Sequence, residues 1–243
     1  MTIEFRYPRP DEEPALRALF TEAFEDKAFT ELFFRTGFSP ERCLGAFDGE
    51  LLAALHWFDC TLEGRKAAYV YGIAAFRSQR GRGIGSALIR EAQKIWKDLG
   101  YETVLLVPAE ASLFGYYERF GFRAVSTIDE STVSAGAPLP IRKLSAAEYA
   151  EARRRLAPER TLIQEGPCLQ LLAGYADFYA TPCAVAAASG QMVWELLGDP
   201  GEAAGLAAAL GLSEATVRTP GEGRPFAMAA GVEGPIHLGL ALD

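Results

Sequence analysis

The chain has 243 residues, of which 49% are hydrophobic and 23% charged, a balance typical of a globular protein with one large or two smaller domains. Its net charge of −8 argues against nucleic-acid binding, because such proteins need a basic surface to neutralise phosphates. Residues 1–10 contain no signal-peptide run and no stretch is apolar enough to span a bilayer, so we expect a cytoplasmic protein with no membrane partner.

The first half alternates patterns typical of strands and helices. In chain order the patterns predict a strand at 3–9, helices at 11–24 and 29–36, strands at 43–47, 51–60 and 66–76, a helix at 84–99, a strand at 103–107, a helix at 112–120 and a strand from 122 to 127. Asp11 is the expected N-cap of the first helix, and Asp48-Gly49 is the expected turn of a hairpin.

The second half begins with a stretch, 134–140, whose glycine and prolines are typical of a linker. Beyond it we expect a helix at 146–156, strands at 178–187 and 191–197, a helix at 202–210, and strands at 216–219, 226–231 and 236–242. The pattern therefore predicts a mixed-sheet α/β (α+β) protein with two units, residues 1–141 and a smaller α+β unit, residues 142–243.

The cysteines do not predict a metal site. Cys43, Cys60, Cys168 and Cys183 are scattered without paired spacing, and only two histidines accompany them. Buried, reduced thiols are the simpler interpretation.

The most informative segment is a glycine-rich turn, Arg80-Gly81-Arg82-Gly83-Ile84-Gly85-Ser86, between a predicted strand and a long predicted helix. A helix start exposes N–H groups and the positive end of the helix dipole, so it attracts phosphate. Three interpretations are open from these residues. A dinucleotide site would need a third glycine where Ser86 stands, a nucleotide-triphosphate loop would need Gly-Lys-Ser/Thr, and the third is a tight turn without a ligand.

Two motifs together resemble the GCN5-related N-acetyltransferases, the GNAT family. Arg80-x-x-Gly83-x-Gly85 matches the family signature R/Q-x-x-G-x-G/A, and residues 111–122, with Tyr117-x-x-x-Gly121-Phe122, resemble its second motif. One helix and one strand separate the motifs, as in the family. The resemblance covers about residues 1–130, and the added length is similar to that of larger members of the enhanced-intracellular-survival type. Pro108 departs from the pattern, since the family often has a polar residue there.

The resemblance implies the acyl-CoA N-acyltransferase fold followed by a smaller GNAT-like domain, with acetyl-CoA bound between strands 66–76 and 103–107. The implied cofactor-binding residues are Ile73, Ala75, Arg80, Gly81, Arg82, Gly83, Ile84, Gly85, Ser86, Ser112 and Leu113. The amides of 80–86 would hold the pyrophosphate, and the backbone of Ile73 and Ala75 would pair with the pantetheine arm. An amide near Ala75 would donate to the thioester oxygen, and Tyr117 would protonate the leaving thiolate.

No general base follows from the sequence. His56, Asp59 and Glu63 lie near the central strands, but a lone histidine in an apolar strand is usually structural. In larger relatives the C-terminal carboxylate can act near the acetyl group, which makes Asp243 a further option.

We therefore expect acetyl transfer from acetyl-CoA to a primary amine, either a small molecule or a peptide N-terminus. The alternative is a catalytically silent acyl-CoA-binding or partner-binding module on the same fold. A nicotinamide oxidoreductase is disfavoured by the missing third glycine. The unit 142–243 has no such turn, so we expect it to bind no second cofactor, to pack on the first unit and to wall the acceptor pocket. The oligomeric state stays open.

Overall fold

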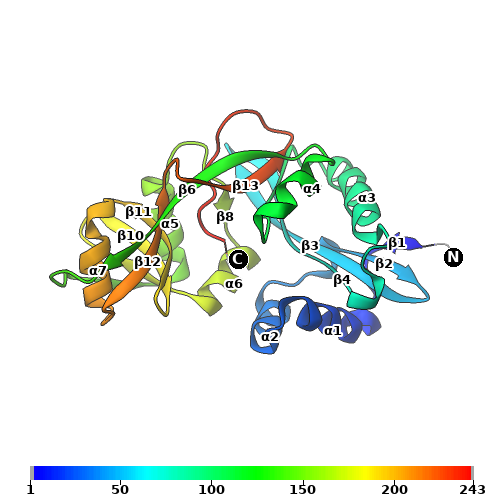
Figure 1. Ribbon diagram of the computed structural model, residues 1–243, viewed down its shortest axis with the longest axis horizontal. Helices are drawn as coiled ribbons and strands as arrows, with labels where there is room; N and C mark the ends of the chain where they lie inside the picture. The colour runs from blue at the N-terminus through cyan, green and yellow to red at the C-terminus, as the bar shows by residue number, and fades with distance from the viewer. Residues whose placement is uncertain (1–2, 242–243) are drawn as a thin grey trace.

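The computed structural model describes residues 3–241, and its strands form one continuous mixed sheet with helices on both faces (Figure 1). The strands are β1 (Glu4–Arg6), β2 (Cys43–Asp48), β3 (Glu50–Leu62), β4 (Arg65–Ala75), β5 (Thr103–Leu106), β6 (Arg123–Ser134), β7 (Arg142–Leu144), β8 (Ile163–Gln164), β9 (Asp177–Ala180), β10 (Ala184–Ser189), β11 (Met192–Gly198), β12 (Glu214–Pro220) and β13 (Arg224–Ala230). The mixed α/β fold class is confirmed.

The helices are α1 (Glu13–Phe24), α2 (Lys27–Thr36), α3 (Ile84–Asp98), α4 (Phe114–Glu118), α5 (Ala146–Leu156), α6 (Pro167–Tyr175) and α7 (Ala203–Ala209). Among residues 3–241, no helix combines the length and the apolar character needed to cross a membrane.

The hairpin of β3 and β4 is covered on both faces. On one face α1 and α2 bury Leu19, Phe20 and Phe33. On the other face α3 buries Trp96, whose ring meets that of Trp57 edge-on at 5.9 Å. Large apolar side chains contribute about 1.5–3 kcal/mol each when fully buried, so these two layers hold β4 rigidly in place.

The second half of the chain completes the sheet of the first half. Strand β13 lies between β5 and β6 and pairs antiparallel with both, and β8 pairs with β3. Strand β6 continues beyond β13 to pair with β12, which carries β11, β10, β9 and β7 in that order. A division of the chain into two units at residue 141 stays a prediction. By sequence β13 would belong to the second unit, but it pairs with β5 in the sheet of the first unit.

The first helix begins differently from the prediction. Asp11 does not cap it, because residues 10–12 form a 3-10 turn and α1 starts at Glu13. The carboxylate of Glu12 accepts a hydrogen bond of 2.7 Å from the amide of Arg9 and pairs with the Arg6 guanidinium. These contacts stabilise the turn in place of a cap.

Two strand predictions in the second half were wrong. The stretch 178–187 is interrupted at residues 181–183, which include Pro182. The Thr181 Oγ1 accepts a hydrogen bond from the amide of Ala184 at 2.9 Å and stabilises this turn. The two halves of the stretch, β9 and β10, therefore pair with each other as antiparallel neighbours. The described part of the expected last strand, 236–241, is irregular apart from an isolated bridge between Thr161 and His237. Helix α6 and the short strands β7 and β8 were not predicted.

Candidate active site

The pairing of β4 with β5 ends partway along β4, and we call this point the divergence of the two strands. They pair in parallel from Ala67↔Thr103 to Val70↔Leu106, after which β5 ends and β4 continues to Ala75. Gly72 lies at a bulge opposite β3, with a φ of +75°, and an added Cβ would lie 2.8 Å from the Phe20 ring. Bulges of this kind bend a strand, and here the bend lies where β4 leaves its partner.

The free edge of β4 presents backbone groups beyond the divergence. The amide of Phe76 donates to the Leu52 carbonyl on β3 at 3.1 Å. Because peptide groups of an antiparallel ladder point alternately toward and away from the partner, those of Ile73 and Ala75 face the open side. The Ala75 carbonyl accordingly accepts from Arg80 Nε at 3.2 Å.

The predicted phosphate turn, Arg80–Ser86, consists of the loop 80–83 and the first residues of α3, 84–86. Gly81 and Gly83 have φ values of +77° and +76°, and Gly83 is the N-cap of α3 without a capping side chain. The guanidinium of Arg82 hydrogen-bonds Gln79, and the hydroxyl of Ser86 lies 3.2 Å from that of Tyr116. The first turn of α3 therefore directs its N–H groups at this loop, where an anion is favoured.

A cavity of about 340 Å³ opens where β4 and β5 diverge. Ile73, Leu113 and Tyr117 line it, whereas Ala75, Ser112 and the turn 80–86 lie outside its lining. Ser112 is exposed and donates to the Glu110 carboxylate. The structure thus brings three of the predicted residues together at one cavity.

The cavity passes from one face of the sheet to the other. Val70, Ile73 and Tyr117 belong to the core on the α3 side, whereas Tyr69 and Tyr71 belong to the core on the α1 and α2 side. The aromatic residues at the second side are Phe24, Phe29, Tyr69, Tyr71, Tyr175 and Trp194. Sequence reasoning missed all six, although the spacing of Tyr69 and Tyr71 by two residues could have placed both on one face of a strand.

A family profile described as an acetyltransferase (GNAT) domain matches residues 4–125, half of the chain. The chain belongs to the GNAT family of acetyltransferases. Family membership places this chain among the acyltransferases and confirms the resemblance found in the two motifs. A search of curated protein sequences gave no significant match.

Solved structures show that the fold is shared beyond the matched half. A GCN5-related N-acetyltransferase from Anabaena variabilis ATCC 29413 has a TM-score of 0.75 and 11% identity, covering 94% of this chain and 72% of that one. One from Kribbella flavida has a TM-score of 0.68 and 16% identity, covering 94% and 70%. Eis1 from Mycobacterium abscessus has a TM-score of 0.65 and 19% identity, covering 90% and 66%. At these identities the likeness concerns the fold alone.

Tyr117 is a titratable group that lines the cavity on the α3 side of the sheet. Its side chain is buried, with 9% exposed. Burial, with a smaller contribution from Tyr116, raises the pKa of Tyr117 to about 12. The phenol therefore keeps its proton at neutral pH, as a proton donor must.

The three groups considered as bases lie outside the cavity lining. Burial, aided by the Arg42 charge, lowers the pKa of His56 to about 3, and its Nε2 accepts from the Ser39 amide at 3.4 Å. Asp59 pairs with Arg42 at 2.8 Å, and Glu63 pairs with Arg160 at 3.3 Å.

The carboxylate among the described lining residues is that of Asp26, which caps α2 by accepting from the Phe29 amide at 2.8 Å. Asp243 lies outside the described residues. Within residues 3–241, no group of three or more His, Cys, Asp or Glu side chains could hold a metal ion.

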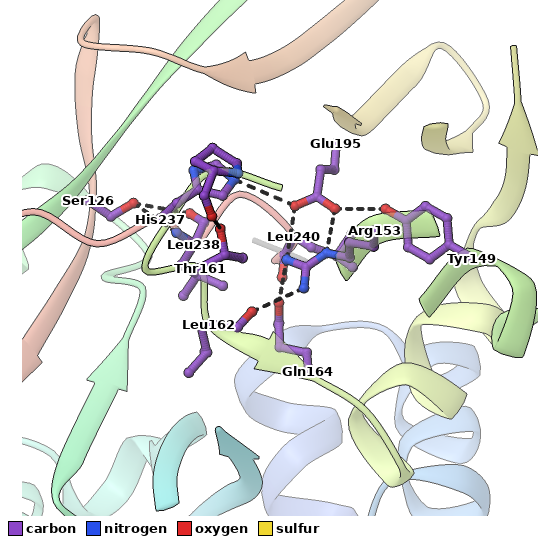
Figure 2. A network of polar contacts seen from close by, with 11 residues as sticks. Ser126, Tyr149, Arg153, Thr161, Leu162, Gln164, Glu195, His237, Leu238 and Leu240 are labelled. Carbon is purple, nitrogen blue, oxygen red and sulfur yellow. Dashed lines mark hydrogen bonds and ion pairs between the residues drawn. The ribbon is translucent and has the colours of Figure 1, made fainter. Parts of the chain in front are cut away.

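A buried ion pair joins Arg153 on α5 to Glu195 on β11, the residue that follows Trp194 in the chain (Figure 2). The side chains of Glu195 and Arg153 are 1% and 3% exposed, and two hydrogen bonds of 2.7 and 3.0 Å join them. Tyr149 donates to the same carboxylate at 2.7 Å. Burial alone would raise the pKa of Glu195, but the Arg153 charge and the contacts with His237 and Arg153 together outweigh it and lower the pKa to about 2, so Glu195 stays ionised.

The same network holds the segment 236–241 (Figure 2). Gln164, which accepts from Arg153 at 3.4 Å, donates to the Leu240 carbonyl at 2.7 Å. The amide of Leu238 donates to Ser126 Oγ at 3.1 Å. Side-chain hydrogen bonds and a few backbone bonds, such as that from the Ile236 amide to the Val125 carbonyl at 2.8 Å, thus hold this segment without a regular strand ladder.

Proposed function

We propose that this GNAT protein transfers the acetyl group of acetyl-CoA to a primary amine. The observation that carries the proposal is the arrangement around the end of β4. The glycine-rich turn follows β4 after a 3-10 turn at Arg77–Gln79 and is tied to β4 by the Arg80–Ala75 hydrogen bond. Tyr117 borders the cavity that opens beside the end of β4. A phosphate-binding turn, a free strand edge and a protonated phenol are the groups that thioester aminolysis requires.

The turn would bind the pyrophosphate through the amides of residues 80–86 and the charges of Arg80 and Arg82. The backbone of Ile73 and Ala75 would pair with the pantetheine arm as an added strand does. Ser112 and Leu113 would flank the arm near the thioester. This pairing is supported by the Ala75 carbonyl, which points away from β3 and accepts a hydrogen bond from Arg80 Nε.

The chemistry requires one proton donor at the sulfur. The ammonium loses a proton to water, its nitrogen attacks the acetyl carbonyl carbon, and the Ala75 amide stabilises the charge that develops on the carbonyl oxygen. When the carbon–sulfur bond breaks, Tyr117 donates its proton to sulfur and recovers one from the nitrogen of the new amide. Amine and acetyl-CoA thus give the acetylated amine and CoA with its free thiol.

The part of the chain beyond residue 141 would form an α+β unit that walls the acceptor site. Tyr175 and Trp194, which line the cavity, belong to this part and support that proposal. We also propose a cytoplasmic location, where thiols stay reduced, which agrees with four free cysteines.

A catalytically silent acyl-CoA-binding module is the second candidate. It is favoured by the positions of His56, Asp59 and Glu63, each engaged in contacts elsewhere.

Two measurements on the purified chain separate these candidates. Acetyl-CoA, but not NADH, should raise the melting temperature, and thiol release should depend on added amine. A thermal shift without thiol release across a broad amine panel would identify the silent module. The absence of both would overturn the assignment to acetyl-CoA.

A further inference from the structure

The aromatic residues of the cavity form one connected wall. Tyr71 lies 6.1 Å from Tyr69 and 6.2 Å from Phe29, measured between ring centroids. Phe29 meets Tyr175 edge-on at 5.9 Å, and Tyr175 lies 5.7 Å from Trp194. These separations are those of aromatic pairs in protein cores, yet this wall borders a cavity.

Part of this wall is open to solvent. Phe24 and Tyr175 are 39% and 37% exposed, and both lie at the same cavity. Phe24 also stacks on Tyr71 at 6.4 Å and 16°. An exposed aromatic surface at the mouth of a cavity indicates a binding site for a flat apolar group.

The wall lies on the side of the sheet opposite to Tyr117. Val70, Ile73 and Tyr117 face the α3 side, where the phosphate turn is located, and the six rings face the α1 and α2 side. Acetyl-CoA bound at the turn 80–86 would reach the divergence of β4 and β5 from the α3 side. The aromatic side of the cavity, toward α1 and α2, would then be open to the acceptor.

The charges at the cavity fit a single ammonium. Asp26 is the one charged residue among the described lining residues, and the overall charge of −8 attracts cations. The Arg218 guanidinium lies 5.1 Å from the Trp194 ring and pairs with Glu130 at 2.8 Å, so the Glu130 carboxylate is already engaged and is not offered to a second ammonium at that end. A polyamine or an aminosugar, which carries several ammonium groups, would find too few carboxylates here.

We propose, resting on the acetyl transfer proposed above, that the acceptor is an arylalkylamine: a primary amine with one positive charge, joined by a short chain to an aromatic ring. Its ring packs against Tyr71, Tyr175 and Trp194, and its amine reaches the divergence of β4 and β5. Asp26 and the faces of the rings attract the ammonium before it loses its proton.

The first test compares amines on the full chain by thiol release from acetyl-CoA. The probes are 2-phenylethylamine, n-hexylamine of similar apolar size, spermidine and kanamycin, with rates expressed per concentration of unprotonated amine. Ring contacts add about two- to tenfold beyond equal apolar burial, so kcat/KM should be higher for 2-phenylethylamine by that factor. Equal values for the two monoamines, or a preference for either polycation, would overturn the proposal.

The second test uses variants of the wall. Tyr175→Ala and Trp194→Leu should reduce the preference for 2-phenylethylamine over n-hexylamine toward one, while the thermal shift with acetyl-CoA stays unchanged. Tyr7→Ala is the matched control, because Tyr7 is 42% exposed and lies outside the cavity lining. A preference that survives both wall variants refutes the site.

Failure of the chemistry can be told apart from failure of the acceptor site. If no amine releases thiol although acetyl-CoA binds, acetyl transfer is wrong. 2-Phenylethylamine should then still raise the melting temperature of the CoA-bound protein more than n-hexylamine does. If 2-phenylethylamine gives no larger thermal shift than n-hexylamine, the proposed acceptor site is wrong as well.

Discussion

Replacing Glu195 by glutamine should destabilise the protein severely, because the buried Arg153 guanidinium loses its counter-ion. The pKa of Glu195 lies at about 2 instead of 4.5. At about 1.4 kcal/mol per pKa unit, ionisation of this carboxylate contributes on the order of 3 kcal/mol to folding. This agrees with the roughly 3–5 kcal/mol that breaking a buried pair usually costs. In a chain of this size the melting temperature should fall by about 6–12 °C.

The assay is urea unfolding of wild type, E195Q, R153M and the double variant at pH 7. We expect a coupling free energy of about 2 kcal/mol, because removing both charges leaves no buried ion unpaired. Glu102→Gln is the control: its pair with Arg65 is 54% and 71% exposed and should contribute less than about 1 kcal/mol.

The pH dependence of the free energy of unfolding provides a second test of the same prediction. Since the folded pKa of Glu195 is depressed, its contribution is present above pH 4.5 and is lost as pH falls toward 2. The difference between wild type and E195Q should therefore shrink over that range. A loss below about 1 kcal/mol at pH 7 would refute the reasoning.

Three further predictions concern the proposed reaction. Gly83→Glu should abolish the thermal shift with acetyl-CoA. Gly83→Ala imposes the same backbone strain at a φ of +76° and likewise meets no atom within 4 Å, but it should keep part of the shift, because only the carboxylate repels the pyrophosphate. Tyr117→Phe should lower kcat about 10²–10⁴-fold at unchanged acetyl-CoA affinity. In the wild type the raised pKa of about 12 keeps Tyr117 protonated, so kcat should show no alkaline decline up to pH 10. Deleting residues 236–243 should lower acceptor turnover while acetyl-CoA still binds. Because the apolar side chains within 236–241 are buried, circular dichroism must first show that the shortened protein is folded, and full turnover would reduce this segment to an accessory role.

The phosphate turn could be predicted because its chemistry is local. Positive φ values at Gly81 and Gly83 and a helix beginning at Ile84 follow from residue types within one short stretch. The hairpin turn at Gly49 was confirmed for the same reason. The roles proposed for these residues stay predictions, since geometry alone does not identify a ligand.

The position of β13 could not be predicted from local patterns. It pairs with β5 and β6, about a hundred residues earlier in the chain, and nothing in its own sequence selects those partners. Helix α6 escaped notice because it begins with Gly166-Pro167 and is short. In both cases tertiary packing decides what the segment becomes.

Two parts of the cavity wall, at Gly72 and at Trp194, could not be predicted because regular alternation fails there. On β4, Gly72 has no partner in the register, since Leu55 pairs with Ile73 and His56 with Tyr71. On β11, Trp194 has none on β10, since Ala187 pairs with Glu195 and Ala188 with Val193. An extra residue redirects the side chains around it, so a period of two assigns the wrong face to one of its neighbours. The bulge at Gly72 lies where β4 leaves β5, and the bulge on β11 lies at Trp194, whose ring lines the cavity. The proposed acceptor site thus depends on two irregularities in distant strands, and only the register of the assembled sheet reveals that they face one cavity.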